Sequence, residues 1–267
     1  MKRFLAIPVF LLVCSLLPLF ADVTVKGSLT RQNDSAPGQT YEGVLELLNS
    51  AETPQEVKVY QTDYFFYADG RVLYGEPGKQ ERSNARWISF NPETFIIPPK
   101  ESALVRYTVT VPADDSLSGS YWSLLMVEGI PEGSPESTIA PGKVGLGVRQ
   151  VFRCGVQMIT DIGAAAAGKI RFVTSRLVKE GTEQSLLLDI ENTGLRWMRA
   201  SVSAELYDPA GTFIGKFEAD PLRLYPGTSG RFKIDLSGVQ NNTYKAFILV
   251  DGGGSDIFGA NLKLVIQ

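Results

Sequence analysis

Apolar and polar residues alternate in short runs along most of the chain, and clusters of Gly, Pro, Asn, Asp and Ser separate these runs. One unit, an apolar run, a proline turn, an alternating strand, a polar turn and a tyrosine-led apolar strand, occupies residues 95–131 and returns over 224–253. Short strands at this spacing, with no long helical period, predict antiparallel β-sandwiches. The repeat predicts two related domains, so the expected fold class is all-β, with two immunoglobulin-like β-sandwich domains in tandem.

The first half of the chain is predicted to hold strands bounded by turn residues. They are expected over residues 23–31, 41–48, 57–66, 72–74, 87–90, 95–97, 103–111 and 121–127. An unusually long strand is predicted over 144–158, with Val144, Leu146 and Val148 on its apolar face. The alternation leaves two interpretations open: the strand completes the core of its own sandwich, or it lends an apolar face and a free edge to another chain.

The second half repeats this plan after an alanine-rich stretch at 163–168, which is the predicted linker. Strands are expected over 185–190, 201–207 and 262–266. Asn192 and Asn49 occupy equivalent strand ends, and Tyr244 is equivalent to Tyr121, which is predicted to form a tyrosine corner. The expected domains are therefore residues 22–162 and 169–267.

The N-terminus has the pattern of an export signal. Lys2 and Arg3 precede an apolar run from Phe4 to Phe20, and Ala21 offers a small residue for cleavage, so residues 1–21 are predicted to be a signal peptide. Lipid attachment at Cys14 is disfavoured because the apolar run continues to Phe20. No later segment has about eighteen uninterrupted apolar residues, so a membrane-spanning helix is not expected in the mature chain.

Composition argues against most kinds of active site. The chain has no histidine, which excludes Ser-His-Asp and Cys-His catalysis and most zinc sites. Loss of Lys2 and Arg3 changes the formal charge from −3 to −5, so no basic surface for nucleic acid is expected. The mature chain keeps one cysteine, Cys154, interpreted as a buried structural residue. We expect no enzyme activity and no cofactor or metal.

Residues 90–152 carry an ordered set of short motifs. They are Asn91-Pro92, Pro98-Pro99, Val105-Arg106, Val111-Pro112-Ala113-Asp114, Tyr121-Trp122 and Gly129-Ile130-Pro131, followed by the alternating run from Val144. In this order they resemble the periplasmic pilus-assembly chaperones, whose two immunoglobulin-like domains form a boomerang. The resemblance implies a periplasmic protein that donates a β-strand to pilus, fimbrial or surface subunits and so aids their folding and assembly.

The resemblance also implies which residues contact the partner. Val144, Leu146 and Val148 match the donor residues that enter a groove in the subunit, and Arg153 matches the basic residue that holds the subunit's C-terminal carboxylate. Arg31 corresponds to a second basic anchor. The implied partners are a pilin-like subunit with an incomplete β-sandwich and an outer-membrane assembly platform. The alternative is a structural or adhesive envelope protein, at the cell surface, that uses the same fold without donating a strand.

Overall fold

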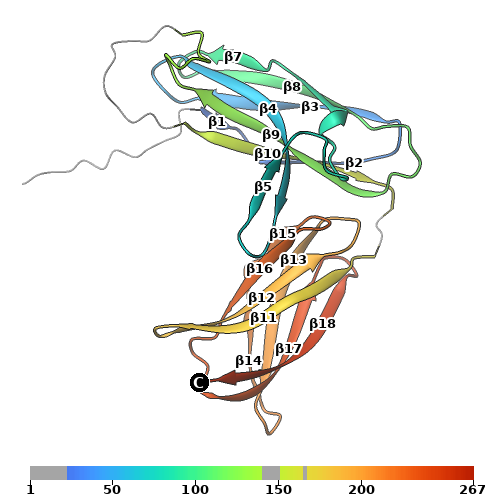
Figure 1. Cartoon of the computed structure of the whole chain (residues 1–267), viewed down its shortest axis with the longest axis vertical. Helices are drawn as coiled ribbons and strands as arrows, with labels where there is room; N and C mark the ends of the chain where they lie inside the picture. Colours follow the sequence, from blue (N-terminus) through green and yellow to red (C-terminus); the bar gives the residue numbers. More distant parts are fainter. Residues whose placement is uncertain (1–22, 140–150, 165–166) are drawn as a thin grey trace, which may run out of the picture.

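The computed structural model describes residues 23–139, 151–164 and 167–267, which form an all-β chain with one short 3-10 helix, η1 (Ala85–Trp87) (Figure 1). The predicted signal peptide and the predicted donor residues Val144, Leu146 and Val148 lie outside the described residues. Within the described ranges, no helix has the length and apolar character needed to cross a membrane.

The first sandwich consists of a four-stranded and a six-stranded sheet. The four-stranded sheet has the order β1 (Val23–Val25), β3 (Thr40–Asn49), β8 (Ser102–Thr110) and β6 (Ile88–Asn91). The six-stranded sheet has the order β2 (Thr30–Ser35), β10 (Arg153–Ile162), β9 (Gly119–Ile130), β4 (Gln55–Phe66) and β5 (Val72–Gly75), and β7 (Thr94–Ile97) also pairs with β4. Alternate apolar side chains from both sheets meet in one core, as the period-2 pattern predicts.

The second sandwich packs a three-stranded sheet against a five-stranded one. The three-stranded sheet has the order β11 (Ile170–Glu180), β12 (Glu183–Asn192) and β16 (Ser229–Asp235). The other has the order β14 (Phe213–Glu218), β13 (Met198–Tyr207), β17 (Asn242–Asp251) and β18 (Ile257–Ile266), with β15 (Leu222–Leu224) also paired to β13. Strand β10 ends at Ile162 and β11 begins at Ile170, and we propose that the two domains divide in the predicted linker between them.

The two sandwiches repeat a buried asparagine at the end of an equivalent strand. Nδ2 of Asn49 donates to the carbonyls of Thr53 (2.9 Å) and Ile97 (3.0 Å), and its Oδ1 accepts from a backbone N–H two residues ahead. Nδ2 of Asn192 donates to the carbonyls of Arg196 (2.7 Å) and Leu224 (3.0 Å), and its Oδ1 also accepts two residues ahead. The shared bonding pattern satisfies the backbone at both strand ends and explains why Asn recurs there.

The tyrosine corner forms in the second sandwich. The Tyr244 hydroxyl donates to the carbonyl of Gln240 at 2.8 Å. The Tyr121 ring lies 4.7 Å from that of Trp87, and within the described ranges its hydroxyl has no hydrogen-bond partner. Among the described residues, the predicted tyrosine corner therefore forms at Tyr244 and not at Tyr121.

Two predicted strands have different bounds in the structure. The strand expected over 23–31 is divided into β1 and β2, which belong to opposite sheets of the first sandwich, so the chain crosses between the sheets at residues 26–29. The strand expected over 144–158 begins, within the described residues, at Arg153 and continues to Ile162, while Val151 and Phe152 precede it as irregular chain. The strand therefore ends at Ile162, four residues later than predicted.

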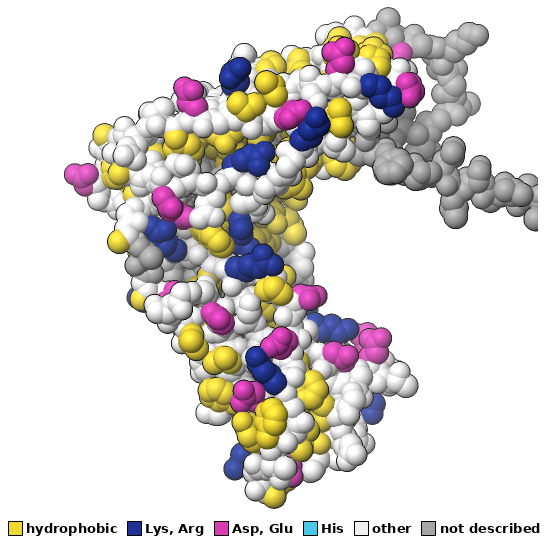
Figure 2. Space-filling view, turned by 180° about the vertical axis from the view of Figure 1, so that it is seen from behind, with side chains coloured by type: hydrophobic (Ala, Val, Ile, Leu, Met, Phe, Trp, Pro, Cys, Tyr) yellow, Lys and Arg dark blue, Asp and Glu magenta, His cyan; other side chains and the backbone are white. Residues whose placement is uncertain are grey.

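A buried aromatic cluster joins the two sandwiches, which lie at an angle to each other (Figures 1 and 2). Trp122 of the first sandwich stacks on Tyr225 of the second, with ring centroids 4.7 Å apart and planes 12° from parallel. The Tyr225 hydroxyl donates to Oε1 of Gln157 at 2.7 Å, and burial raises the pKa of Tyr225 to about 12, so this donor stays protonated at neutral pH. The backbone closes the junction as well, because Ser120 N donates to the carbonyl of Leu195 at 2.8 Å.

Candidate functional site

Strand β10 has one edge that is only partly paired. Its first edge pairs with β9 along its whole length, whereas its second edge pairs with β2, in parallel, only from Gln157 to Ile162. The N–H of Gln157 donates to the carbonyl of Leu29 on this second side, so the N–H groups of Arg153 and Gly155 point the same way. Among the described residues no strand pairs with Arg153–Val156 on that side. We call these four residues the open edge.

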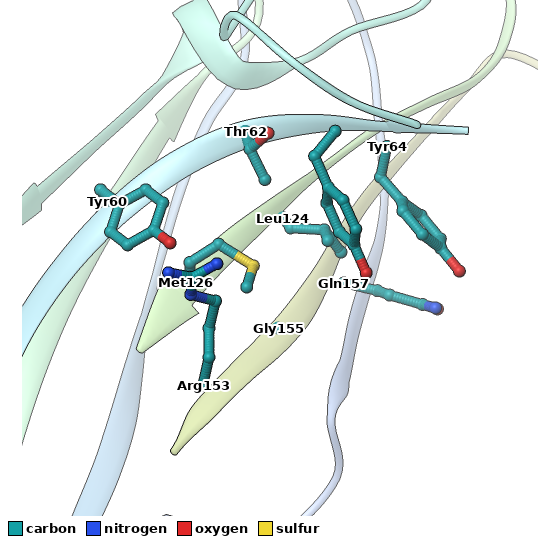
Figure 3. Close-up of a pocket in the computed structure, with 9 residues that line it drawn as sticks. Tyr60, Thr62, Tyr64, Leu124, Met126, Arg153, Gly155 and Gln157 are labelled. Atoms are coloured by element: carbon teal, nitrogen blue, oxygen red, sulfur yellow. The ribbon is translucent and has the colours of Figure 1, made fainter. Parts of the chain in front are cut away.

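A groove lies beside the open edge, on the outer face of the six-stranded sheet (Figure 3). Side chains alternate along β10, so Val156 and Met158 enter the core while Arg153, Gly155 and Gln157 lie on the groove side. The groove has a volume of about 370 Å³. Its other lining residues are Tyr60, Thr62 and Tyr64 from β4, Tyr74 from β5, and Leu124 and Met126 from β9.

Gly155 accounts for the depth of this groove. A Cβ atom at position 155 would lie 3.1 Å from Sδ of Met126 and 3.2 Å from Cδ1 of Leu124, closer than ordinary contact. Both of these residues are about 5% exposed, so a side chain at position 155 would displace them and project into the groove that Gly155 lines. The hollow therefore exists because this strand position carries no side chain.

An ion pair forms one end of the groove. Nε and Nη2 of Arg153 donate to the two carboxylate oxygens of Glu128 at 2.8 and 3.0 Å, and the Tyr60 hydroxyl donates to the same carboxylate at 2.8 Å. Burial raises the pKa of Glu128, but the hydrogen bonds from Arg153 and Tyr60 and the charge of Lys58 outweigh it, so the net pKa is lowered. The hydrogen bond with Glu128 in turn raises the pKa of Arg153. Glu128 is thus an ionised, paired carboxylate.

The structure separates the two arginines that the sequence places at the partner site. Arg153 lies at the start of β10 on the groove side, with its side chain 56% exposed. Arg31 is in register with Met158 across the parallel pair of β2 and β10, and Met158 points into the core. Residues in register share a face, so Arg31 lies on the face opposite Arg153. Nη1 of Arg31 donates to the carbonyl of Ser28 at 2.6 Å.

Cys154, next to Arg153, is predicted to be a buried structural residue, and this holds in part. It is a free thiol and is half-buried rather than fully buried. Burial raises its pKa, which disfavours the reactive thiolate.

Sequence reasoning missed the groove itself. The signal was present in the alternation of Tyr60, Thr62 and Tyr64, which puts all three on one face of a predicted strand. Their meeting with Gly155 and Met126 depends on the order β10-β9-β4 in the sheet. That order is a property of the tertiary fold.

No protein-family model matches the chain, and no curated protein matches it. Solved structures similar to it include one of a chaperone–tip adhesin complex of CFA/I fimbriae biogenesis, at 11% identity over 92% of this chain and 99% of that chain, with a TM-score of 0.48. The Escherichia coli chaperone DraB is 14% identical over 90% and 98% of the two chains, with a TM-score of 0.44. The Salmonella enterica SafA pilin in complex with the SafB chaperone gives 16% identity over 92% and 98%, with a TM-score of 0.42. Each of these three structures contains a chaperone, and each similarity is at low sequence identity.

Proposed function

We propose that this protein is a periplasmic chaperone-like protein that binds pilus, fimbrial or other surface subunits by β-strand addition and aids their folding and assembly. The observation that carries this proposal is the open edge of β10, four consecutive residues whose backbone has no strand partner on one side among the described residues. The proposed partner is a subunit with an incomplete β-sandwich, which an outer-membrane assembly platform then receives.

An open strand edge and an incomplete sandwich can each supply the backbone hydrogen-bond partners that the other lacks. An unpaired strand edge presents N–H and C=O groups in a row, and an added strand pairs with them while its alternate side chains fill pockets. A subunit that lacks one strand exposes its core and an edge of its own. Pairing with the donor strand therefore covers apolar surface and completes hydrogen bonds at once.

The donor side chains are proposed to be Val144, Leu146 and Val148, which precede the open edge in the chain. Residues two apart in a strand share a face, so these three would enter the partner's core together. Arg153 contributes at the edge itself: its Nε and Nη2 are bonded to Glu128, and Nη1 is proposed to reach a carboxylate of the partner. Arg31 is proposed as a separate contact on the opposite face.

Site-specific photo-crosslinking tests the proposal. A photoreactive phenylalanine analogue is placed at Leu146, at Val148 or, as the control, at Val265, an exposed apolar residue of β18 in the second sandwich. We expect covalent adducts with a β-sandwich subunit of the cell envelope from positions 146 and 148 and none from 265. Equal adducts from all three positions, or none while the wild-type chain still co-purifies with envelope proteins, contradict strand donation.

A charge variant gives an independent readout. Replacing Leu146 and Val148 together by Glu puts two charges into the proposed apolar contact, which should abolish subunit binding because an unpaired buried charge is costly. Far-UV circular dichroism checks that the fold is retained. Binding that survives with an intact fold favours the alternative, a structural or adhesive envelope protein.

A further inference from the structure

Gly155 lies inside the open edge and also forms the floor of the groove, so the edge and the hollow are continuous (Figure 3). We infer that the hollow over Gly155 receives an aromatic side chain from the strand that the partner adds at this edge. The inference rests on the proposed function and deepens it, because it states what the partner's strand must carry at one position.

Strand geometry places the occupant. A strand added beside Arg153–Val156 puts one of its residues directly opposite Gly155, with the two positions about 4.5–5.5 Å apart. That residue points to the same face as Gly155, which is the groove side. A glycine in a sheet leaves space that a cross-strand aromatic ring can cover, a device known from stabilised β-proteins.

The lining suits a ring. Leu124 and Met126 form an apolar base, and the thioether of Met126 favours contact with an aromatic edge. Tyr60 and Tyr64 from β4 add ring surfaces across the groove, where offset or edge-to-face packing is favourable. A volume of about 370 Å³ is large enough for one aromatic side chain.

Two polar groups that line the groove, the Thr62 hydroxyl and Oε1 of Gln157, are already engaged within the chain. The Thr62 hydroxyl donates to the carbonyl of Gly75 at 2.8 Å. Oε1 of Gln157 accepts from the Tyr225 hydroxyl at 2.7 Å and from Thr30 at 3.4 Å. A polar occupant would lose its water without gaining these atoms as partners, which costs free energy.

The charges at the groove are balanced as well. Glu128 is paired with Arg153 and lies 3.8 Å from Lys58, so the end of the groove holds neither a free anion nor a free bidentate cation. A charged side chain over Gly155 would be attracted to one member of this pair and repelled by the other. The two effects oppose each other, so a charged occupant has little to offset the loss of its water, and the ring-lined shape favours a neutral aromatic one.

Host–guest peptides test this inference on the full-length chain. Capped eight-residue peptides of alternating Val and Thr, labelled with a fluorophore, carry Phe, Leu, Ser or Asp at one central position, and binding is followed by fluorescence anisotropy. For the wild type we expect the Phe guest to bind about tenfold more tightly than the Ser guest, as expected for burial of a ring. We expect the Asp guest to bind most weakly.

Two glycine variants locate the effect. Gly155→Leu fills the hollow, so the preference for Phe over Ser should fall to about twofold or less. Gly129→Leu is the matched control, because Gly129 is also a strand glycine and a Cβ there meets nothing within 4 Å; its Phe preference should equal that of the wild type. Circular dichroism and the urea midpoint establish that both variants are folded.

Each other outcome overturns the inference. Equal binding of all guests by the wild type, or an unchanged Phe preference in Gly155→Leu, contradicts the placement of an aromatic ring in the hollow. Neither result bears on the proposed strand donation. Failure of every guest to bind, with crosslinks still formed from positions 146 and 148, has the same meaning. If a second copy of this chain were the occupant, the wild type would sediment as a dimer that Gly155→Leu dissociates. Loss of both peptide binding and crosslinks overturns the proposed function too.

Discussion

The stacked pair of Trp122 and Tyr225 is predicted to hold the two sandwiches together, and Tyr225→Ala removes it. Tyr225 is fully buried, its ring lies 4.7 Å from that of Trp122, and its hydroxyl bonds to Gln157 across the junction. Truncating a large buried aromatic side chain to Ala costs about 3–5 kcal/mol. Tyr225→Phe keeps the ring and loses only the hydroxyl bond, which contributes about 1 kcal/mol.

Urea unfolding followed by two signals measures this effect. Two of the three tryptophans, Trp122 and Trp197, lie in the junction cluster, so tryptophan fluorescence reports mainly on the junction while far-UV circular dichroism reports on both sandwiches. In Tyr225→Ala we expect the fluorescence transition to precede the circular dichroism transition, and the free energy taken from the fluorescence transition to fall by about 3–5 kcal/mol. Tyr225→Phe should lose about 1 kcal/mol with the two transitions still coincident.

A surface tyrosine provides the control. Tyr74 is 62% exposed on β5, so Tyr74→Ala should change the free energy of unfolding by no more than about 0.5 kcal/mol. If Tyr225→Ala also loses less than about 1 kcal/mol, or if its two transitions coincide, the stacked pair does not couple the sandwiches and the reasoning from burial and stacking is refuted.

Three further predictions concern local structure. Asn192→Ala removes three hydrogen bonds of a fully buried side chain and should cost about 2–4 kcal/mol in urea unfolding; a loss below about 1 kcal/mol would contradict it. The hydrogen bond from Arg231, with its charge, outweighs burial and lowers the pKa of Asp189. The stabilisation that the ionised Asp189 gives is therefore fully present above the unfolded pKa of about 4 and is lost as pH falls through the lower folded pKa. The difference in the free energy of unfolding between wild type and Asp189→Asn should therefore narrow below about pH 4; a difference that does not change with pH refutes this. Gly119→Ala makes the new Cβ clash with the backbone oxygen of Leu195 in the second sandwich, so it should lower the thermal midpoint more than Gly211→Ala, which has a similar positive φ but open space around it; equal thermal midpoints for the two variants would argue against the clash.

Local pattern was enough to predict much of the fold. The strands expected at 41–48, 57–66 and 103–111 are β3, β4 and β8 with bounds within a few residues, because burial on one face imposes a period of two. The duplicated unit was visible through paired positions such as Asn49 and Asn192, whose side chains make the same backbone bonds. Such features can be predicted from short stretches of sequence.

The open edge was only half predictable. Its strand was expected from alternation, but which side of β10 remains open depends on β2, which lies more than a hundred residues earlier and pairs with β10 in parallel. Parallel pairing joins segments that no short turn connects. The alternation therefore left two interpretations, and the pairing of β2 from Gln157 onward decides where the open edge ends.

What the sequence by itself determined is the all-β class, the repeat of two sandwich units and the absence of any histidine-based chemistry. What only the tertiary structure decided is which side chains meet: Arg153 with Glu128, Tyr225 with Trp122, and the ring-lined hollow over Gly155. The physical reason is that a strand fixes which residues share its face, whereas strand order and register fix which faces adjoin. Register and order follow from the packing of the whole core, and no local pattern contains them.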